Sequence, residues 1–170
     1  MAALGYLPRS AVNGRWDYRT QQAVMAFQAW SGIGRDGTVG PETIAALETR
    51  ETPRPTVSRG RRIEIYRARG VALLIENGRL RRAIHVSTGK RGFETPIGTF
   101  RVFRKERNSW SVPYRVWLPY ASYFRGGIAF HGYTDVPARP ASHGCVRVPH
   151  PEAPGVYAFA TIGTTVAVYR

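Results

Sequence analysis

The sequence predicts two domains: a small all-α module of the three-helix type at residues 1–50, and a mostly-β domain at residues 59–170 with one helix near its C-terminal end. Apolar residues recur at helical spacing in the first fifty residues. After about residue 59 the pattern changes to short strand-like runs separated by glycine and proline. Residues 51–58 hold two prolines and almost no apolar side chains, which indicates an extended linker.

The first predicted helix begins after Asp17, a residue type that caps helix N-termini well, and ends at Gly32 and Gly34. Pro41 and Glu42 indicate the first turn of a second helix, where proline is tolerated and an acid interacts favourably with the helix dipole. The apolar positions of the two helices are Val24, Phe27, Trp30, Ile44 and Leu47. Fifty residues give only a marginal core, so we interpret this segment as an accessory module.

The second domain begins with alternating and apolar runs, and Asn77-Gly78 is a hairpin-turn signal between two of them. Only residues 151–160 look helical in this part of the chain. The predicted strands are residues 62–66, 71–76, 80–87, 98–103, 114–118, 128–131 and 165–169.

The formal net charge of the chain is +14, and residues 51–170 hold 20 of the 25 basic residues but only 7 of the 11 acids. Such a charge attracts polyanions, and anionic cell-wall polymers are one class of partner that fits. The basic residues are scattered between apolar ones, and no nucleic-acid-binding motif accompanies them, so we do not expect nucleic acid as a partner. No segment approaches the ~18–20 apolar residues of a transmembrane helix.

The single cysteine, Cys145, lies in the run Ser-His-Gly-Cys-Val-Arg at residues 142–147, and His131 lies fourteen positions upstream. A histidine can remove the proton of a nucleophilic thiol, and both His131 and His143 are candidates for that base. A lone cysteine is more often a small buried apolar residue. A metal site made from His131, His143, Cys145 and His150 is a further alternative, but it lacks the usual paired short ligand spacings, so no metal is expected.

Four motifs in register resemble the YkuD-type catalytic domain of the L,D-transpeptidases over about residues 61–168. They are Ser-Thr-Gly at 87–89, Thr-Pro-Ile-Gly-Thr-Phe at 95–100, Phe-His-Gly-Tyr at 130–133, and the cysteine run at 142–147. The first fifty residues resemble a small peptidoglycan-binding module. The residues that carry this second resemblance are Gly14, Thr20, Ala23, Val24, Phe27, Gln28, Asp36, Gly37 and the run 39–43. The first helix of that module would normally begin before Met1, so we expect a longer precursor with an export signal.

The resemblance implies that Cys145 is the nucleophile and His131 its base. It also implies that the backbone carbonyl of Gly132 orients the imidazole of His131. The backbone N–H groups of His143, Gly144 and Cys145 would form the oxyanion hole, because glycine permits conformations that point successive amides into one concavity. No metal or organic cofactor is implied.

Arg147 follows the nucleophile and can pair with a substrate carboxylate in two parallel hydrogen bonds. Ser142 and Tyr133, within the same motifs, are expected to contribute to substrate binding. We further expect a substrate-covering flap that contains Tyr114, Trp117 and Tyr120.

The activity implied by the resemblance is cross-linking of peptidoglycan stem peptides outside the cytoplasm, in the cell wall or periplasm. Cys145 would attack after the third-position diamino acid of a tetrapeptide stem, usually meso-diaminopimelate, and D-alanine would leave. The amine of another stem would then take the acyl group. β-Lactams, carbapenems above all, would acylate the same cysteine. Two alternatives remain: an L,D-carboxypeptidase with water as acceptor, and a wall-binding protein without catalysis.

Overall fold

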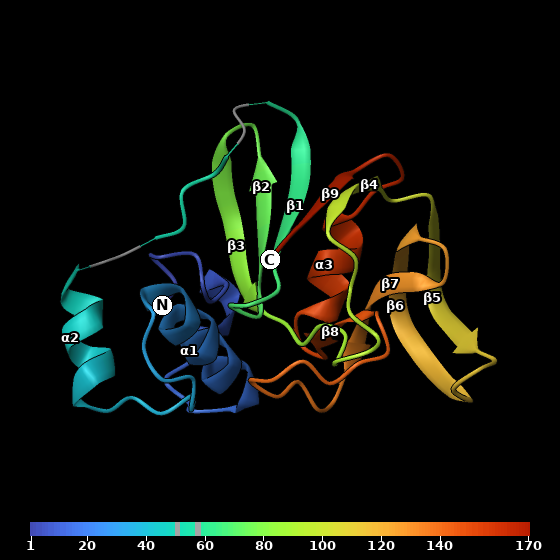
Figure 1. Ribbon diagram of the computed structural model, residues 1–170. Helices are drawn as coiled ribbons and strands as arrows, with labels where there is room; N and C mark the ends of the chain where they lie inside the picture. The colour runs from blue at the N-terminus through green and yellow to red at the C-terminus, as the bar shows by residue number, and fades with distance from the viewer. Residues whose placement is uncertain (50–51, 57–58) are drawn as a thin grey trace.

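The computed structural model describes residues 1–49, 52–56 and 59–170. One sheet contains β1 (Arg61–Tyr66), β2 (Val71–Glu76), β3 (Arg79–His85), β4 (Gly98–Arg101) and β9 (Thr165–Tyr169). Its strand order is β3-β2-β1-β9-β4. β1 pairs with β2 in antiparallel and with β9 in parallel orientation, so the first and last strands of the β-rich domain are neighbours (Figure 1).

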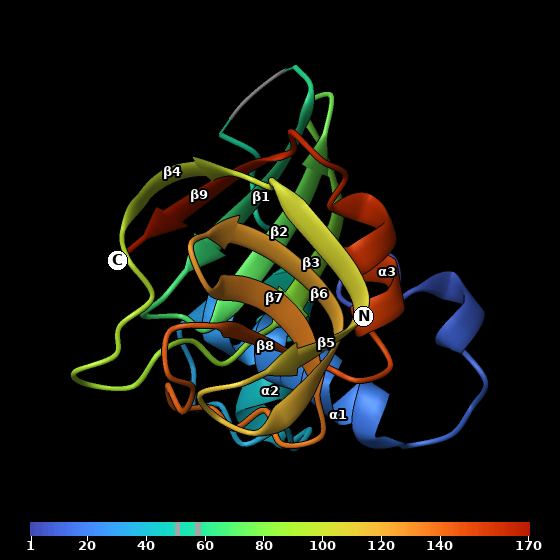
Figure 2. The same cartoon turned by 90° about the vertical axis from the view of Figure 1, so that its right-hand side faces the viewer.

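The second sheet contains β5 (Arg104–Ser111), β6 (Val116–Arg125), β7 (Ile128–Tyr133) and β8 (Val146–Pro149), in that order. β5, β6 and β7 are antiparallel, whereas β8 runs parallel to β7. Figure 2 looks onto this curved sheet, with the N-terminal module behind it. The first three strands are joined by short turns, as expected for antiparallel neighbours.

The main core lies between the two sheets and α3 (Ala153–Phe159). Ile63 and Ile65 of β1 contribute to it from one sheet, and Phe124 and Phe130 contribute from the other. α3 contacts β6 and β7, which places the helix against the second sheet. The predicted fold class, a small helical module followed by a mostly-β domain with one late helix, is confirmed.

The N-terminal module contains η1 (Arg9–Ala11), α1 (Tyr18–Ser31) and α2 (Pro41–Thr49). Asp17 caps α1 as predicted, and its Oδ1 accepts a hydrogen bond from the Thr20 backbone at 2.8 Å. Gly32 ends the helix in the left-handed region, with φ of 74°. α2 begins at Pro41, again as the sequence predicts.

The module packs against the outer face of β2 and β3 instead of standing apart from the sheet. Phe27 of α1 and Tyr6 are buried in one cluster with Leu73 and Ile75 of β2 and Ala83 of β3. β2 therefore buries apolar side chains on both faces, because Ala72 and Leu74 point into the main core. This double burial explains why the strand is a continuous apolar run and does not alternate.

Polar contacts also join the N-terminal module to the β-rich domain. Glu152, at the N-cap position of α3, accepts Arg19 of α1 at 2.5 Å and pairs with Arg82 of β3 at 2.9 Å. His85 of β3 is buried, and its Nδ1 lies 2.7 Å from Oε1 of Gln22 on α1. The N-terminal module is therefore fixed on the sheet by apolar and charged contacts together.

The predicted linker lies partly outside the described residues, which leave out 50, 51, 57 and 58. Within its described part, Pro53 is buried. The hydroxyl of Thr56 donates to the carboxylate of Glu64, a residue of β1 with no exposed surface. These two contacts hold residues 52–56 against the protein.

Two strands were missed by the sequence prediction, and a third was misplaced. β5 was missed because its residues are largely polar and exposed, as befits an edge strand of a hairpin. β8 is only four residues long and follows the cysteine motif directly. The strand predicted at 114–118 was wrong at its start, because residues 112–115 form the hairpin turn and β6 continues to Arg125.

Candidate active site

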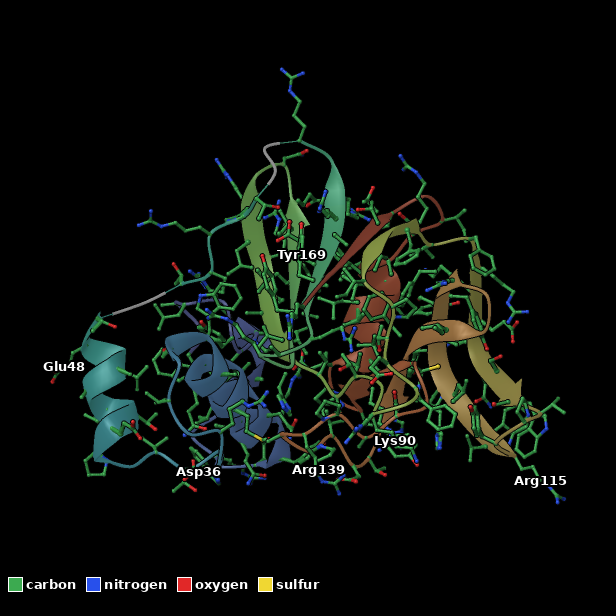
Figure 3. The ribbon with its side chains drawn as sticks, viewed as in Figure 1. Asp36, Glu48, Lys90, Arg115, Arg139 and Tyr169 are labelled. Carbon is green, nitrogen blue, oxygen red and sulfur yellow. The ribbon has the colours of Figure 1, made fainter. Side chains whose placement is uncertain are left out.

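A cleft of about 660 Å³ lies over the face of the second sheet that points away from the main core, under the β5–β6 hairpin. Arg115 is at the tip of this hairpin in Figure 3. Of the eight residues that the sequence assigns to catalysis, the oxyanion hole or substrate binding, six line the cleft: His131, Tyr133, Ser142, His143, Cys145 and Arg147. The other two, Gly132 and Gly144, contribute to the site through their backbone.

Strand alternation explains how the sequence brings these side chains together. In the parallel β7–β8 pair, His131 is in register with Arg147, and Phe130 is in register with Val146. Phe130 and Val146 are buried in the main core, so the residues on either side of them point to the opposite face. Cys145 and Arg147, two positions apart, therefore share that face with His131.

The imidazole of His131 is held in one orientation. Its Nδ1 lies 3.0 Å from the carbonyl oxygen of Gly132, which makes Nδ1 the donor and leaves Nε2 free to accept a proton. Burial lowers the pKa of His131 to about 4, although the Gly132 carbonyl opposes that shift. The ring is therefore neutral at pH 7.

Cys145 is partly buried immediately before β8, and its thiol donates to the carbonyl of Gly127 at an Sγ–O distance of 3.7 Å. Burial raises the pKa of the Cys145 thiol, and the Ala129 amide and the charge of Arg147 offset part of that rise. Resting thiol and resting imidazole are thus both uncharged, because burial disfavours the ionised form of each group.

The loop before Cys145 is shaped by internal hydrogen bonds. Ser142 Oγ donates to the carbonyl of Cys145 and accepts the amide of Gly144 at 3.2 Å. Gly144 has φ of 111°, which an L side chain rarely adopts. The buried hydroxyl of Thr95 donates to the Gly144 carbonyl at 2.8 Å and accepts the Gly89 amide at 3.0 Å.

The motif at 87–89 lies beside the cysteine run. Ser87 forms an isolated antiparallel bridge with Arg147, and Gly89 forms a parallel bridge with Ser142. A Cβ on Gly89 would lie 1.9 Å from the carbonyl oxygen of Phe93, so only glycine fits this crossing. The upstream motifs thus support the backbone that carries the thiol.

Arg147 reaches into the cleft over the ring of Tyr133, with its Cζ 4.1 Å from the ring centroid. Within the described parts of the chain, no carboxylate forms an ion pair with Arg147. A second guanidinium, that of Arg104, lines the cleft from β5. Its Cζ lies 3.9 Å from the ring centroid of Tyr123.

His143 does not share the buried environment of His131. Its ring is exposed and stacks on Tyr114 of the hairpin turn at 4.6 Å between centroids, and it meets Phe93 edge-on at 4.9 Å. Of the three residues expected in a flap, Tyr114 lines the cleft. Trp117 instead packs on Trp110, and Tyr120 packs against the main core.

Across residues 1–49, 52–56 and 59–170, no three His, Cys, Asp or Glu side chains gather closely enough to hold a metal ion. No helix in these same residues is long and apolar enough to cross a membrane.

Residues 60–168 match the family described as the L,D-transpeptidase catalytic domain. This chain belongs to the L,D-transpeptidase family. Residues 1–47 of this L,D-transpeptidase match a putative peptidoglycan binding domain. The search of curated proteins found no match.

Solved L,D-transpeptidases share the fold. The crystal structure of one from Xylanimonas cellulosilytica is 37% identical, with a TM-score of 0.86 over 92% of this chain and 83% of that chain. An L,D-transpeptidase from Stackebrandtia nassauensis is 27% identical, with a TM-score of 0.67 over 93% and 81% of the two chains. L,D-transpeptidase 3 from Mycobacterium tuberculosis, solved with a faropenem-derived adduct, is 20% identical, with a TM-score of 0.59 over 65% and 60%.

Three residues that contact or line the cleft of this L,D-transpeptidase were not expected there from the sequence. Gly127 contributes a backbone carbonyl, and a pattern of side chains in the sequence does not predict such an acceptor. Thr95 belongs to a motif that the sequence singled out, but its contact with Gly144 spans 49 positions. In the sequence nothing distinguishes Arg104 from other surface arginines, and only the position of β5 in the structure brings it to the cleft.

Proposed function

We propose that the protein is a peptidoglycan L,D-transpeptidase that works through a cysteine acyl-enzyme. One observation carries the proposal: His131 and Cys145 line the same cleft, and the Gly132 carbonyl holds His131 with Nε2 free as the acceptor of the thiol proton. Membership of the family supports the same chemistry.

In the first step, Cys145 Sγ bonds to the carbonyl carbon of the third-position diamino acid while His131 Nε2 takes the thiol proton. The backbone amides of His143 and Cys145 donate to the oxyanion that forms. The amide of Gly144 is excluded from this role as long as it donates to Ser142 Oγ. The C–N bond then breaks, the imidazolium returns its proton to the departing amine of D-alanine, and a thioester remains.

In the second step, the side-chain amine of another stem attacks the thioester and gives a proton to His131. The tetrahedral intermediate collapses, and Cys145 leaves as a thiol. Because burial disfavours the charged form of both groups, the thiol proton must be transferred to His131 for acylation to proceed.

Arg147 is assigned to a carboxylate of the donor stem. Its guanidinium is in the cleft and has no acidic partner among the described residues, so its hydrogen-bond donors are available to a ligand. Tyr133 supports the guanidinium from below, and Ser142 acts on the substrate through the loop that it shapes.

Acylation by a carbapenem tests the nucleophile and the base. We expect intact-protein mass spectrometry to find one adduct on the wild type, none on Cys145→Ala, and slow formation on His131→Gln. A solved L,D-transpeptidase in complex with imipenem, a carbapenem, supports the choice of probe. An adduct that forms equally on Cys145→Ala would overturn the assignment of the nucleophile.

The acceptor is tested with a purified tetrapeptide stem, with and without a second stem as acceptor. A cross-linked dimer supports transpeptidation, whereas a tripeptide formed by hydrolysis alone supports the L,D-carboxypeptidase. A wild type that binds peptidoglycan but turns over neither substrate supports a binding protein without catalysis.

We also assign the protein to the cell wall or periplasm, because its family acts on peptidoglycan. The N-terminal module would contact the wall from a fixed position on the sheet, since α1 packs against β3. Its contribution is measured by the binding of the full chain to insoluble peptidoglycan, with and without substitutions on the exposed face of α2.

A further inference from the structure

A second concavity, of about 430 Å³, shares no residue with the active-site cleft. It lies where β1 and β9 begin and β4 ends. In Figure 1 the start of β1 and the loop before β9 are at the upper end of the molecule, away from β8. Among the described residues, four arginines and no acid line this concavity: Arg59, Arg61, Arg62 and Arg101. We call it the arginine cleft.

Sheet register explains why the arginines converge. Thr165 at the start of β9 pairs with Arg62 of β1 on one side and with Arg101 of β4 on the other. Residues in register across neighbouring strands point to the same face, and strands are about 4.8 Å apart. Ile63 and Val166, the next residues, are buried in the main core, so Arg62, Thr165 and Arg101 share the outer face.

The charges in the arginine cleft are only partly neutralised. Arg61 pairs with Glu76 at 2.6 Å, and Arg62 pairs with Glu64 at 3.1 Å. Arg101 donates only to the carbonyl of Gly163, which carries no charge. Within residues 1–49, 52–56 and 59–170, neither Arg59 nor Arg101 forms an ion pair with an acid. Two exposed guanidiniums thus line one open groove, that of Arg59 from the bend before β1 and that of Arg101 from the end of β4.

We propose that the arginine cleft is a binding site for a polymer of phosphodiesters. Guanidinium groups bind phosphate through paired N–H donors. A tetrahedral phosphate accepts hydrogen bonds from several directions, so it can bridge Arg59 and Arg101 and also accept from the hydroxyl of Thr165. The open shape of the groove suits a chain that passes through it.

The test uses the full chain and fluorescently labelled poly(glycerol phosphate), whose only charges are phosphodiesters. We expect salt-sensitive binding by fluorescence anisotropy, and Arg59→Gln/Arg101→Gln should weaken it about tenfold at low salt, since each exposed charge pair is worth up to about 1 kcal/mol. Arg9→Gln/Arg15→Gln removes the same charge elsewhere and should change affinity little. Equal weakening by both double variants, or no binding by the wild type, would overturn the proposal.

Two further measurements separate phosphate recognition from a general attraction to anions and from an effect on the active site. Poly-L-glutamate of similar length should bind less tightly, and equal affinity would contradict a phosphodiester site. Carbapenem acylation of Arg59→Gln/Arg101→Gln should match the wild type, because the arginine cleft and the active-site cleft share no residue. The binding result is thus independent of the proposed catalytic function.

Discussion

Replacement of Phe27 by alanine tests whether the N-terminal module and the β-rich domain unfold as one unit. Phe27 is 0% exposed in the cluster that joins α1 to β2 and β3. Its ring meets Tyr6 edge-on, with centroids 5.4 Å apart. Truncation of a buried phenylalanine to alanine costs about 3–5 kcal/mol of unfolding free energy, because apolar burial is lost and a cavity remains.

For a chain of this size, 1 kcal/mol changes the melting temperature by about 2–4 °C, so Phe27→Ala should lower it by roughly 6–20 °C. The decrease should appear as one shifted transition in differential scanning calorimetry, because the lost contacts belong to both domains. Ile44→Ala is the control: Ile44 is on α2 but 52% exposed. We expect that change to stay within about 0.5 kcal/mol.

Two results would refute the reasoning. A separate early transition for the module, with the main transition unchanged, would mean that the two domains are energetically independent. A shift no larger than that of Ile44→Ala would mean that the shared cluster contributes little. Carbapenem acylation, measured well below the transition, should be unaffected, because Phe27 does not line the active-site cleft.

Three further predictions concern buried histidines, the hairpin and a tight glycine. Burial lowers the pKa of His85 to about 3 and that of His131 to about 4, whereas both histidines of the unfolded chain take up a proton near pH 6.5. As pH decreases from about 6.5 towards 4, the unfolding free energy should therefore fall by up to about 1.4 kcal/mol per pH unit for each histidine. His85→Asn should roughly halve that slope in urea titrations; an unchanged slope contradicts the assignment. Tyr114→Ala should slow acylation several-fold through loss of the stacked ring, and Tyr114→Phe should retain the rate; equal losses would implicate the hydroxyl instead. Gly132→Ala would put a Cβ 2.8 Å from Nδ1 of His150. It should lower the unfolding free energy by about 1–3 kcal/mol and slow acylation at least about tenfold. A wild-type acylation rate would show that the backbone at this position tolerates the shift.

Local signals in the sequence predicted much of the fold. Asp17, Gly32 and Pro41 mark helix ends through their own backbone chemistry, and they do so in the structure. β2 was predicted because its apolar run identifies a buried strand without reference to the strands that pair with it. β5 was missed because its exposed polar residues become a strand only through pairing with β6.

The docking of the N-terminal module could not be predicted either. The continuous apolar run at residues 71–75 indicates a strand buried on both faces, but it does not say what covers each face. The spacing of apolar residues shows which residues form one strand, whereas the packing of Phe27 near Leu73 depends on how the whole chain folds.

The sequence predicted those parts of the candidate site that consist of side chains within recognisable motifs. The side chains singled out at 131, 133, 142, 143, 145 and 147 line one cleft. The backbone acceptor at Gly127 and the bridge from Thr95 to Gly144 were not foreseen, because both depend on tertiary geometry. The oxyanion hole stays a prediction, and the Gly144 amide donates to Ser142 Oγ at 3.2 Å.

The position of β9 has a consequence for how the chain acquires its fold. β9 lies between β1 and β4, and Ile63 is beside Val166, about one hundred residues later in the sequence. Closure of so long a loop costs chain entropy before any contact compensates for it. The helical module and β1–β3 can assemble early in synthesis, but β1 and β4 lack the strand between them until residues 165–169 have been made. Removal of these residues would delete an interior strand that joins β1 to β4, so the sheet would lose the pairing of both neighbours.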